Sequence, residues 1–426
     1  MLTFLGGKDK YCDGLSRRSF LQVGAFGAGL SLVDLLRGKS EAAQAGRTTR
    51  QKSAIMIYLG GGPSHMDMWD LKPNAPQEFR GEFRPIQTNV ADCQICEHFP
   101  MQARMWDKLA AIRSIVSVNE HSDTNVMTGH SDREQRVRQY PSFGSFISKL
   151  RSGQSPVPPF VSLRGSTRGT EPAFLGVAHR PFTPSGPGLA NLSRARGIDG
   201  TRMNDRQALL REVDSLRSDI DATGTMEGLD SFQTQAFDLV TSGGIRNALD
   251  LDREEPRVRD RYRGLDNFLR ALRLVEAGVG CVTLGIGGWD THSNNFRSLK
   301  SKLPALDRGI ATLVSDLIAR GLYDDTITIV WGEFGRTPRV NGRAGRDHWP
   351  AVMSAMIAGG GLRMGQMVGA STDRGERPAD GRCTTSNVLS TVYTAMGIDP
   401  AQTILDNSGR PRYILDERQT IRALLS

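Results

Sequence analysis

The sequence predicts an α/β fold, a mainly parallel central sheet with helices on both faces. Short, largely apolar runs alternate along the chain with segments whose apolar side chains recur at helical spacing. Apolar runs of this kind are typical of strands buried on both faces, and helices that alternate with them cover the two faces of a parallel sheet. The length of 426 residues is ample for one large domain of this class.

Five apolar runs are predicted as buried strands, at residues 53–59, 109–116, 279–286, 326–331 and 352–358. The first runs into Gly60-Gly61-Gly62-Pro63, and the third and fifth also end in glycines. Glycine and proline at these points are typical of a strand that ends in a tight loop. After the first loop, Ser64 is in place to cap a helix that begins near His65.

Four apolar stripes at helical spacing predict helices that cover the sheet, at residues 209–220, 265–275, 306–317 and 388–396. The stretch 165–200 is rich in Gly, Pro, Ser and Arg and is predicted to be a surface insertion, with added helices over 201–260. We therefore expect a single domain over residues 46–426 that carries an insertion around 165–260. After the N-terminal region no run of 18 apolar residues occurs, so no membrane span is expected in the mature chain.

The N-terminal 45 residues have the features of an export signal. Ser16–Leu21 matches a twin-arginine translocation motif, a weakly apolar and Gly-rich segment follows to Leu36, and Ala43-Gln44-Ala45 is a small-x-small cleavage pattern. The alternative is an amphipathic N-terminal helix that stays attached. The twin-arginine route carries folded proteins, often with a cofactor already bound. We therefore expect a periplasmic or cell-envelope protein, with a weak indication of a metalloprotein.

The charge of the chain excludes one class of partner. Lys and Arg number 54 against 46 Asp and Glu, a net charge of +8 without a dense basic block. A nucleic-acid partner would require clustered basic residues and a recognisable reading motif, so none is expected. Anionic small substrates are compatible with this balance.

Two cysteines form a single CxxC motif. Cys93 and Cys96 have no second cysteine cluster to complete a structural zinc site. A local disulfide and two separate thiols both remain open.

Histidines and carboxylates gather where the predicted strands end. In open parallel sheets, ligands bind outside the carboxyl ends of the strands. Four of the seven histidines lie in these loops together with carboxylates. The loop residues are His65 and Asp67 after the first strand, Asn119 and His121 after the second, Asp290 and His292 after the third, Glu333 after the fourth, and Asp347 and His348 before the fifth.

Mixed histidine and carboxylate ligands suit zinc, manganese or iron, with calcium or magnesium at carboxylate-rich positions. We expect one or two divalent ions, because two adjacent metals would explain so many candidate ligands. Such a pair clamps the attacking and leaving oxygens of a displacement at phosphorus or sulfur.

Each motif also has a plainer interpretation. An Asp-x-His sequence is commonly a helix cap or surface polarity, Asp347-His348 could be a turn, and Glu333 could pair with a nearby arginine. Arg336 and Arg346 could hold an anionic substrate or neutralise the carboxylates. The shared placement at strand ends favours a polar active-site cluster.

Four motifs resemble those of a bacterial family of exported proteins that is abundant in planctomycetes, the family of domain of unknown function 1501. They are GGGPSHMD at 60–67, GWDTH at 288–292, EFGRTP at 333–338 and GRDHW at 345–349. The resemblance covers residues 50–424. The family is similar to the alkaline phosphatase and sulfatase superfamily, which implies a two-metal α/β hydrolase fold.

The resemblance implies roles for several of these residues. Asp67 resembles the metal-binding acid near the end of the first strand, Asp290 and His292 resemble later metal ligands, and His348 resembles the final histidine ligand. Glu333 and Phe334 stand at the two positions of an Asp-His pair. With the strand-end residues, the candidate metal ligands are His65, Asp67, Asp290, His292, Glu333, Asp347 and His348.

The chain departs from the superfamily pattern at the nucleophile. That residue lies nine positions before a Thr-Gly pair, which here places Asn119, a poor nucleophile, at the position. The Cys-x-Pro-Ser-Arg motif of formylglycine sulfatases is absent, and Phe334 removes a metal ligand. Ser122 or Thr124 could substitute as nucleophile, or a metal-activated water could attack directly with His121 as general acid or base. The candidate catalytic residues are His121, Asn119, Thr124 and Arg336.

Two functions follow from these observations. The first is an exported metal-dependent hydrolase of phosphate or sulfate esters, acting on an anionic small molecule or a polysaccharide. The second is a non-catalytic exported binding or assembly protein that retains the fold.

Overall fold

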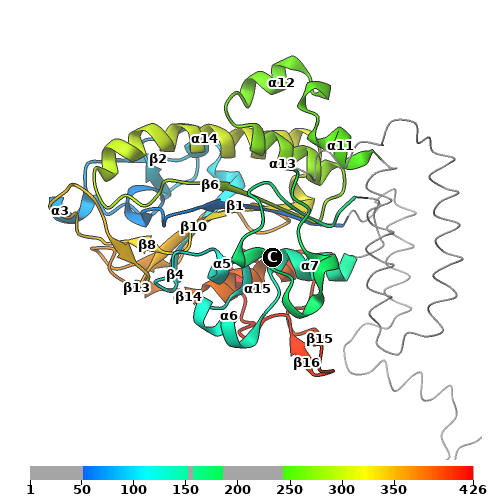
Figure 1. Ribbon diagram of the computed structural model, residues 1–426. Helices are drawn as coiled ribbons and strands as arrows, with labels where there is room; N and C mark the ends of the chain where they lie inside the picture. Colours follow the sequence, from blue (N-terminus) through cyan, green and yellow to red (C-terminus); the bar gives the residue numbers. More distant parts are fainter. Residues whose placement is uncertain (1–50, 152–156, 186–242, 426) are drawn as a thin grey trace, which may run out of the picture. The chain divides into compact units, whose positions relative to one another are not determined.

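A computed structural model describes residues 51–151, 157–185 and 243–425 (Figure 1). The predicted export signal over 1–45, the apolar stripe at 209–220 and residues 186–242 of the predicted insertion lie outside the described residues. The described residues from Lys52 onward form one unit of packed structure. Within the described ranges, no helix has both the length and the apolar character that crossing a membrane requires.

The centre of the protein is an eight-stranded sheet. Its strands are β1 (Ser53–Leu59), β4 (Leu109–Val116), β5 (Phe160–Ser162), β6 (Cys281–Ile286), β7 (Thr326–Trp331), β10 (Met353–Gly359), β11 (Gln366–Val368) and β14 (Cys383–Thr384). The order is β11-β4-β10-β7-β1-β6-β5, with β14 also beside β4. Both ladders of β10 are antiparallel, whereas the other strand pairs are parallel, so the prediction of a mainly parallel sheet is confirmed.

The side chains of β1 show why this segment forms a central strand. All seven residues are buried. The odd-numbered side chains from Ile55 to Leu59 belong to one hydrophobic core, and the even-numbered side chains from Ala54 to Tyr58 belong to the other. Burial of one large aliphatic side chain is worth about 1.5–3 kcal/mol, so both faces of the strand favour this position.

Helices cover both faces of the sheet (Figure 1). The helices α13 (Asp266–Glu276) and α14 (Asn295–Ala319) pack on one core, and α5 (Thr124–Thr128), α7 (Phe143–Arg151) and α15 (Thr385–Ala395) pack on the other. The remaining elements are α3 (Gln77–Arg80), α4 (Pro100–Ala103), α6 (Asp132–Arg138), α11 (Gly244–Leu249), α12 (Pro256–Arg261), β2 (Pro85–Gln87), β3 (Gln94–Cys96), β8 (Gly335–Arg336), β9 (His348–Trp349), β12 (Ala370–Ser371), β13 (Pro378–Asp380), β15 (Thr403–Leu405) and β16 (Pro411–Tyr413), together with short 3-10 turns.

The direction of β10 positions one of the site loops. Because β10 is antiparallel to β4 and β7, it begins at the edge where those strands end. The loop over residues 345–349, which precedes β10, therefore reaches the same edge as the loops that follow the parallel strands. This is the edge at which open α/β sheets bind their ligands.

The predicted strands and helices within the described residues are present, with differences at the first loop and in residues 165–185. The five predicted strands and the helices over 265–275, 306–317 and 388–396 all occur. The helix expected from His65 is only a 3-10 turn over His65–Asp67, and Ser64 makes no side-chain cap hydrogen bond. Residues 165–185 contain three 3-10 turns. Gly169 and Thr170 in the first turn are buried, so this part is not wholly a surface segment.

The cysteines of the CxxC motif are separate thiols. Cys93 and Cys96 are both free and buried. Burial raises the pKa of the Cys96 thiol to about 12, so it stays protonated near neutral pH. Both side chains belong to the hydrophobic core and serve as small apolar groups there.

His179 gives the fold an acid-sensitive group. Burial lowers its pKa to about 4, from an ordinary value of 6.5. The unfolded chain therefore binds a proton more readily than the folded chain as pH falls from 6.5 toward 4. We expect this residue to lower the free energy of unfolding by up to about 3 kcal/mol across that window. Urea unfolding at pH 7.5, 5.5 and 4.5 measures the loss, and a His179→Gln variant should show a shallower pH dependence. An unchanged dependence would contradict the assignment.

Candidate metal centre

Asp290, His292 and His348 meet at the carboxyl edge of the sheet. Asp290 and His292 lie in the loop after β6, and His348 begins β9, in the loop before β10. The β1 loop packs directly against this group, since a Cβ on Gly61 would lie 2.4 Å from the backbone nitrogen of Asp290. With a φ of +113°, that position accepts only glycine.

The three side chains present their ligand atoms to one point. Asp290 Oδ1 lies 3.0 Å from His292 Nε2 and 3.2 Å from His348 Nε2, and the two Nε2 atoms are 3.0 Å apart. A metal about 2.0–2.1 Å from each ligand separates neighbouring ligand atoms by about 2.9–3.3 Å, from octahedral to tetrahedral geometry. The three atoms therefore have the spacing of one face of a coordination polyhedron, and the donor set fits a divalent ion.

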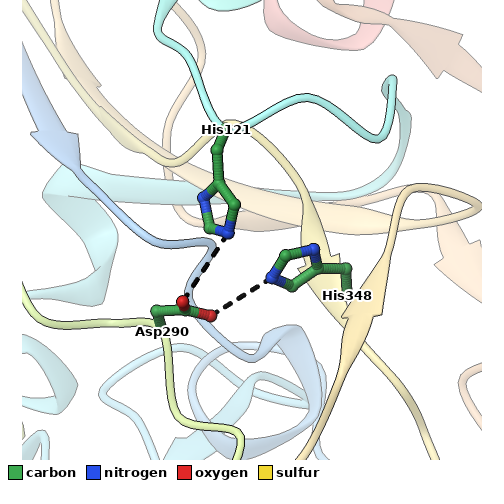
Figure 2. Close-up of side chains that lie close together, drawn as sticks. All are labelled: His121, Asp290 and His348. Atoms are coloured by element: carbon green, nitrogen blue, oxygen red, sulfur yellow. Dashed lines mark hydrogen bonds and ion pairs between the residues drawn. The ribbon is translucent and has the colours of Figure 1, made fainter.

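His121 faces the same group from the loop after β4. Figure 2 shows its ring directed at Asp290, with Nε2 at 3.6 Å from Asp290 Oδ2. One ligand atom from each of His121, Asp290 and His348 lies within 4.8 Å of the others. His121 contacts the second carboxylate oxygen of Asp290, so it stands beside the three-atom face.

Asp347 and Asn341 orient the ring of His292. Asp347 Oδ1 is 2.6 Å from His292 Nδ1, and Asn341 Nδ2 donates to Asp347 Oδ2 at 3.2 Å. The hydrogen bond with His292, together with that from Asn341, lowers the pKa of Asp347 below its ordinary value. A carboxylate on Nδ1 leaves Nε2 as the ligand atom, which is the usual support for a metal-binding histidine.

Arg336 lies buried beneath Asp290. Its Nη2 is 2.5 Å from Asp290 Oδ1, its Nε donates to the carbonyl oxygen of Gly62 at 2.8 Å, and its Nη1 donates to that of Arg346 at 3.1 Å. It also bonds to the carbonyl oxygen of Gly61. Burial acts to raise the pKa of Asp290, but hydrogen bonds from Arg336 and His348 outweigh it and hold the pKa below its ordinary value. Asp290 is therefore ionised near neutral pH.

The pKa of His348 also suits a ligand. Burial lowers this pKa below the ordinary value, although the hydrogen bond to Asp290 acts in the opposite direction. The imidazole is therefore neutral near pH 7, which is the form that binds a metal.

Glu333 lies next to this group, with its carboxylate turned to other partners. The side chain is 2% exposed. It accepts hydrogen bonds from the amides of Gly61 at 2.9 Å and Gly62 at 3.2 Å, and His121 Nδ1 is 3.3 Å away. The ring of Phe334 packs 4.4 Å from that of His348.

Asp67 and His65, the two candidate ligands after β1, bond to residues outside the group of Asp290, His292 and His348. Asp67 and Arg346 form a fully buried ion pair with two contacts, Nε to Oδ2 at 2.8 Å and Nη2 to Oδ1 at 3.0 Å. Asn295 Nδ2 also donates to Asp67 Oδ2 at 2.8 Å. His65 is buried, with Nε2 2.9 Å from the carbonyl oxygen of Gly375, and burial lowers its pKa. The structure therefore does not bring Asp67 or His65 into the three-atom face.

The candidate nucleophiles also lie apart from it. Asn119 is exposed, and Ser122 donates to Asp132 at 2.9 Å. Thr124 is buried at the start of α5, and its hydroxyl has no hydrogen-bond partner among the described residues. Within the described part of the chain, none of these three side chains has a hydrogen bond to Asp290, His292 or His348.

Two supporting residues were not predicted from the sequence. Tyr58 lies within β1 and contacts Glu333, and Asn341 supports Asp347. Both lack a motif of their own. Tyr58 carries a weak signal, since a polar aromatic residue near the carboxyl end of a buried strand needs a partner for its hydroxyl.

A mainly parallel sheet covered by helices defines an α/β protein, and its histidines and carboxylate lie at the edge where sheets of this class bind ligands. The chain belongs to the family described as Protein of unknown function (DUF1501), whose model matches residues 51–425. This membership confirms the family to which the four motifs point. A search of curated proteins gives no match.

Several solved structures are similar to this chain. A phosphonate monoester hydrolase from Silicibacter pomeroyi is 11% identical with a TM-score of 0.40, over 82% of this chain and 74% of that chain. The PsFucS1 sulfatase from Pseudoalteromonas sp. is 12% identical with a TM-score of 0.38, over 84% and 70%. The C-terminal periplasmic domain of EcEptC from Escherichia coli, in a complex with Zn, is 7% identical with a TM-score of 0.38, over 87% of each chain. The fold assignment rests on the order and directions of the strands.

The buried pair of Asp67 and Arg346 should stabilise the fold without affecting metal binding. We expect Asp67→Asn to lower the free energy of unfolding by about 3–5 kcal/mol, because it leaves the guanidinium uncompensated. Urea unfolding measures this loss, with the exposed Asp373→Asn as the matched control. A variant of unchanged stability that has lost bound metal would instead identify Asp67 as a ligand.

Proposed function

We propose that this protein is an exported metal-dependent hydrolase of phosphate or sulfate esters, in which Asp290, His292 and His348 hold one divalent ion. The single observation that carries the proposal is the spacing of their three ligand atoms, 3.0–3.2 Å apart in all pairs. Two imidazoles and a carboxylate favour zinc, manganese or iron over calcium, which prefers oxygen ligands alone.

The surrounding residues have defined tasks in this proposal. When bound, the ion supplies Lewis-acid polarisation of the ester oxygen. Arg336 keeps Asp290 ionised, and Asp347 fixes the ring of His292. The side chain of His121 is 48% exposed at the rim of the centre, where it can exchange a proton with substrate or water.

The substrate class follows from access and charge. The carboxylate of Asp290 is 43% exposed, so the centre is open to solvent. Arg343 is exposed and close enough to Asp347 to lower the pKa of that residue, and Arg339 is exposed in the same loop. Neither arginine has an ion-pair partner among the described residues. The exposed guanidinium of Arg343 attracts anions, so an anionic small molecule or an anionic polysaccharide ester fits best.

The N-terminal residues support a place of action outside the cytoplasm. The twin-arginine motif at Ser16–Leu21 and the cleavage pattern that ends at Ala45 support export to the periplasm or cell envelope.

A binding or assembly role is the second candidate function. The observation that favours it is the contact between Arg336 and Asp290, since a buried guanidinium already compensates this carboxylate without a metal. The exposed Asn119 at the expected nucleophile position supports the same interpretation.

Metal content separates the two functions. We expect about one equivalent of zinc, manganese or iron in the purified full chain by plasma mass spectrometry, because three protein ligands suffice for a catalytic site. Asp290→Asn and His348→Ala should reduce it below about a tenth, since each removes one of three ligands. Exposed Asp373→Asn is the control and should keep the metal. Absence of metal from the wild type, purified without chelator, would favour the binding protein.

Turnover tests the hydrolase directly. We expect the metal-loaded chain to cleave aryl phosphate or aryl sulfate esters, and His292→Ala to reduce kcat/KM by at least about 100-fold, the usual scale for the loss of an essential catalytic group. Circular dichroism of each variant controls for folding. Metal-loaded wild type that releases no aryl alcohol from phosphate, sulfate or phosphonate monoesters would contradict the proposal.

A further inference from the structure

We propose that Glu333 is a positioning residue that holds His121 in one orientation and one tautomer, and that it takes no part in binding the metal. The inference rests on the proposed function, because it assigns a task within the same centre.

The carboxylate of Glu333 is engaged by partners other than a metal. An ionised carboxylate has about four positions that can accept a hydrogen bond. Gly61 and Gly62 donate their amide N–H groups to it, at 2.9 Å and 3.2 Å. His121 Nδ1 is 3.3 Å away. Two backbone donors and one ring nitrogen therefore use most of the accepting capacity of Glu333.

The backbone conformation of the β1 loop maintains this arrangement. Gly62 has a φ of +72°, and a Cβ there would lie 2.4 Å from the ring of Phe334. Only glycine can bring the amides of Gly61 and Gly62 against the buried carboxylate. A side chain at Gly62 would clash with Phe334 and displace these two donors.

Tyr58 is a second neighbour of Glu333. Burial raises the pKa of its hydroxyl well above the ordinary value, and the charge of Glu333 adds to the effect. The hydroxyl therefore stays protonated. The guanidinium of Arg164 covers the Tyr58 ring at 4.1 Å.

His121 receives its orientation from Glu333. A carboxylate only accepts hydrogen bonds, so the Nδ1 atom of His121 carries a proton. Nε2 is the atom that faces Asp290. The rings of Phe334 and His348 pack edge-on against His121, at 5.1 Å and 4.3 Å between centroids. A half-exposed loop histidine is thus held on three sides, as a proton-transfer group oriented by a carboxylate requires.

The test compares Glu333→Gln with His121→Ala and with the double variant. A glutamine at 333 keeps the volume, but its NH2 must face either the amides of Gly61 and Gly62 or His121. Glu255→Gln, exposed at the start of α12, is the matched control. Metal content, kcat and KM are measured on the full chain.

We expect Glu333→Gln to retain the metal and KM but to lower kcat by about 10–100-fold, the scale of a misplaced catalytic group. The double variant should be no slower than His121→Ala, because both changes disable the same group. Loss of metal in Glu333→Gln, or additive effects in the double variant, would overturn the proposal.

A second readout needs no turnover and therefore separates this inference from the proposed function. Nitrogen NMR of zinc-loaded protein with labelled histidines reports the tautomer of each ring, and His121→Ala assigns the resonance. We expect the Nδ1–H tautomer of His121 in the wild type and its loss in Glu333→Gln. The same tautomer in both proteins would overturn the proposal.

Discussion

The candidate centre depends on the buried guanidinium of Arg336. It bonds to the carbonyl oxygens of Gly61, Gly62 and Arg346 and to the carboxylate of Asp290. These partners belong to three loops, after β1, after β6 and before β10, so one side chain ties together the segments that bring the ligands into place. A buried cation without its partners would cost several kcal/mol, and the three loops therefore keep a common arrangement.

Arg346 is a second buried arginine that pairs with a carboxylate, next to the centre. The sequence left two roles open for both arginines, to hold an anionic substrate or to neutralise carboxylates. The contacts of Arg336 with Asp290 and of Arg346 with Asp67 favour the second role. Both guanidinium groups are fully buried, which leaves exposed residues such as Arg343 to meet an anionic substrate. Arg336 and Arg346, which both belong to the recognised motifs, thus neutralise carboxylates within the protein.

Local patterns predicted much of the fold and the core of the centre. β1 and β6 were identifiable because an apolar run and the glycines that end it lie within a few residues, and the strand-end rule led to Asp290, His292 and His348. The surroundings of Glu333 were not predictable, because its amide partners lie 272 and 271 positions away. The antiparallel direction of β10 was missed for the same reason, since tertiary contacts and not local periodicity decide it.

The order of the strands has a consequence for how the chain acquires its structure. β1 is made first, yet its neighbours β6 and β7 follow more than 200 residues later, with Ala54 opposite Cys281 and Ser53 opposite Thr326. β10 then enters between β4 and β7. A sheet whose paired strands lie so far apart in the sequence folds slowly, because the entropy of closing long loops is lost before the strand pairs form. During synthesis, β1 therefore remains unpaired until β6 and β7 have been made, and the centre is completed only after β10 has left the ribosome.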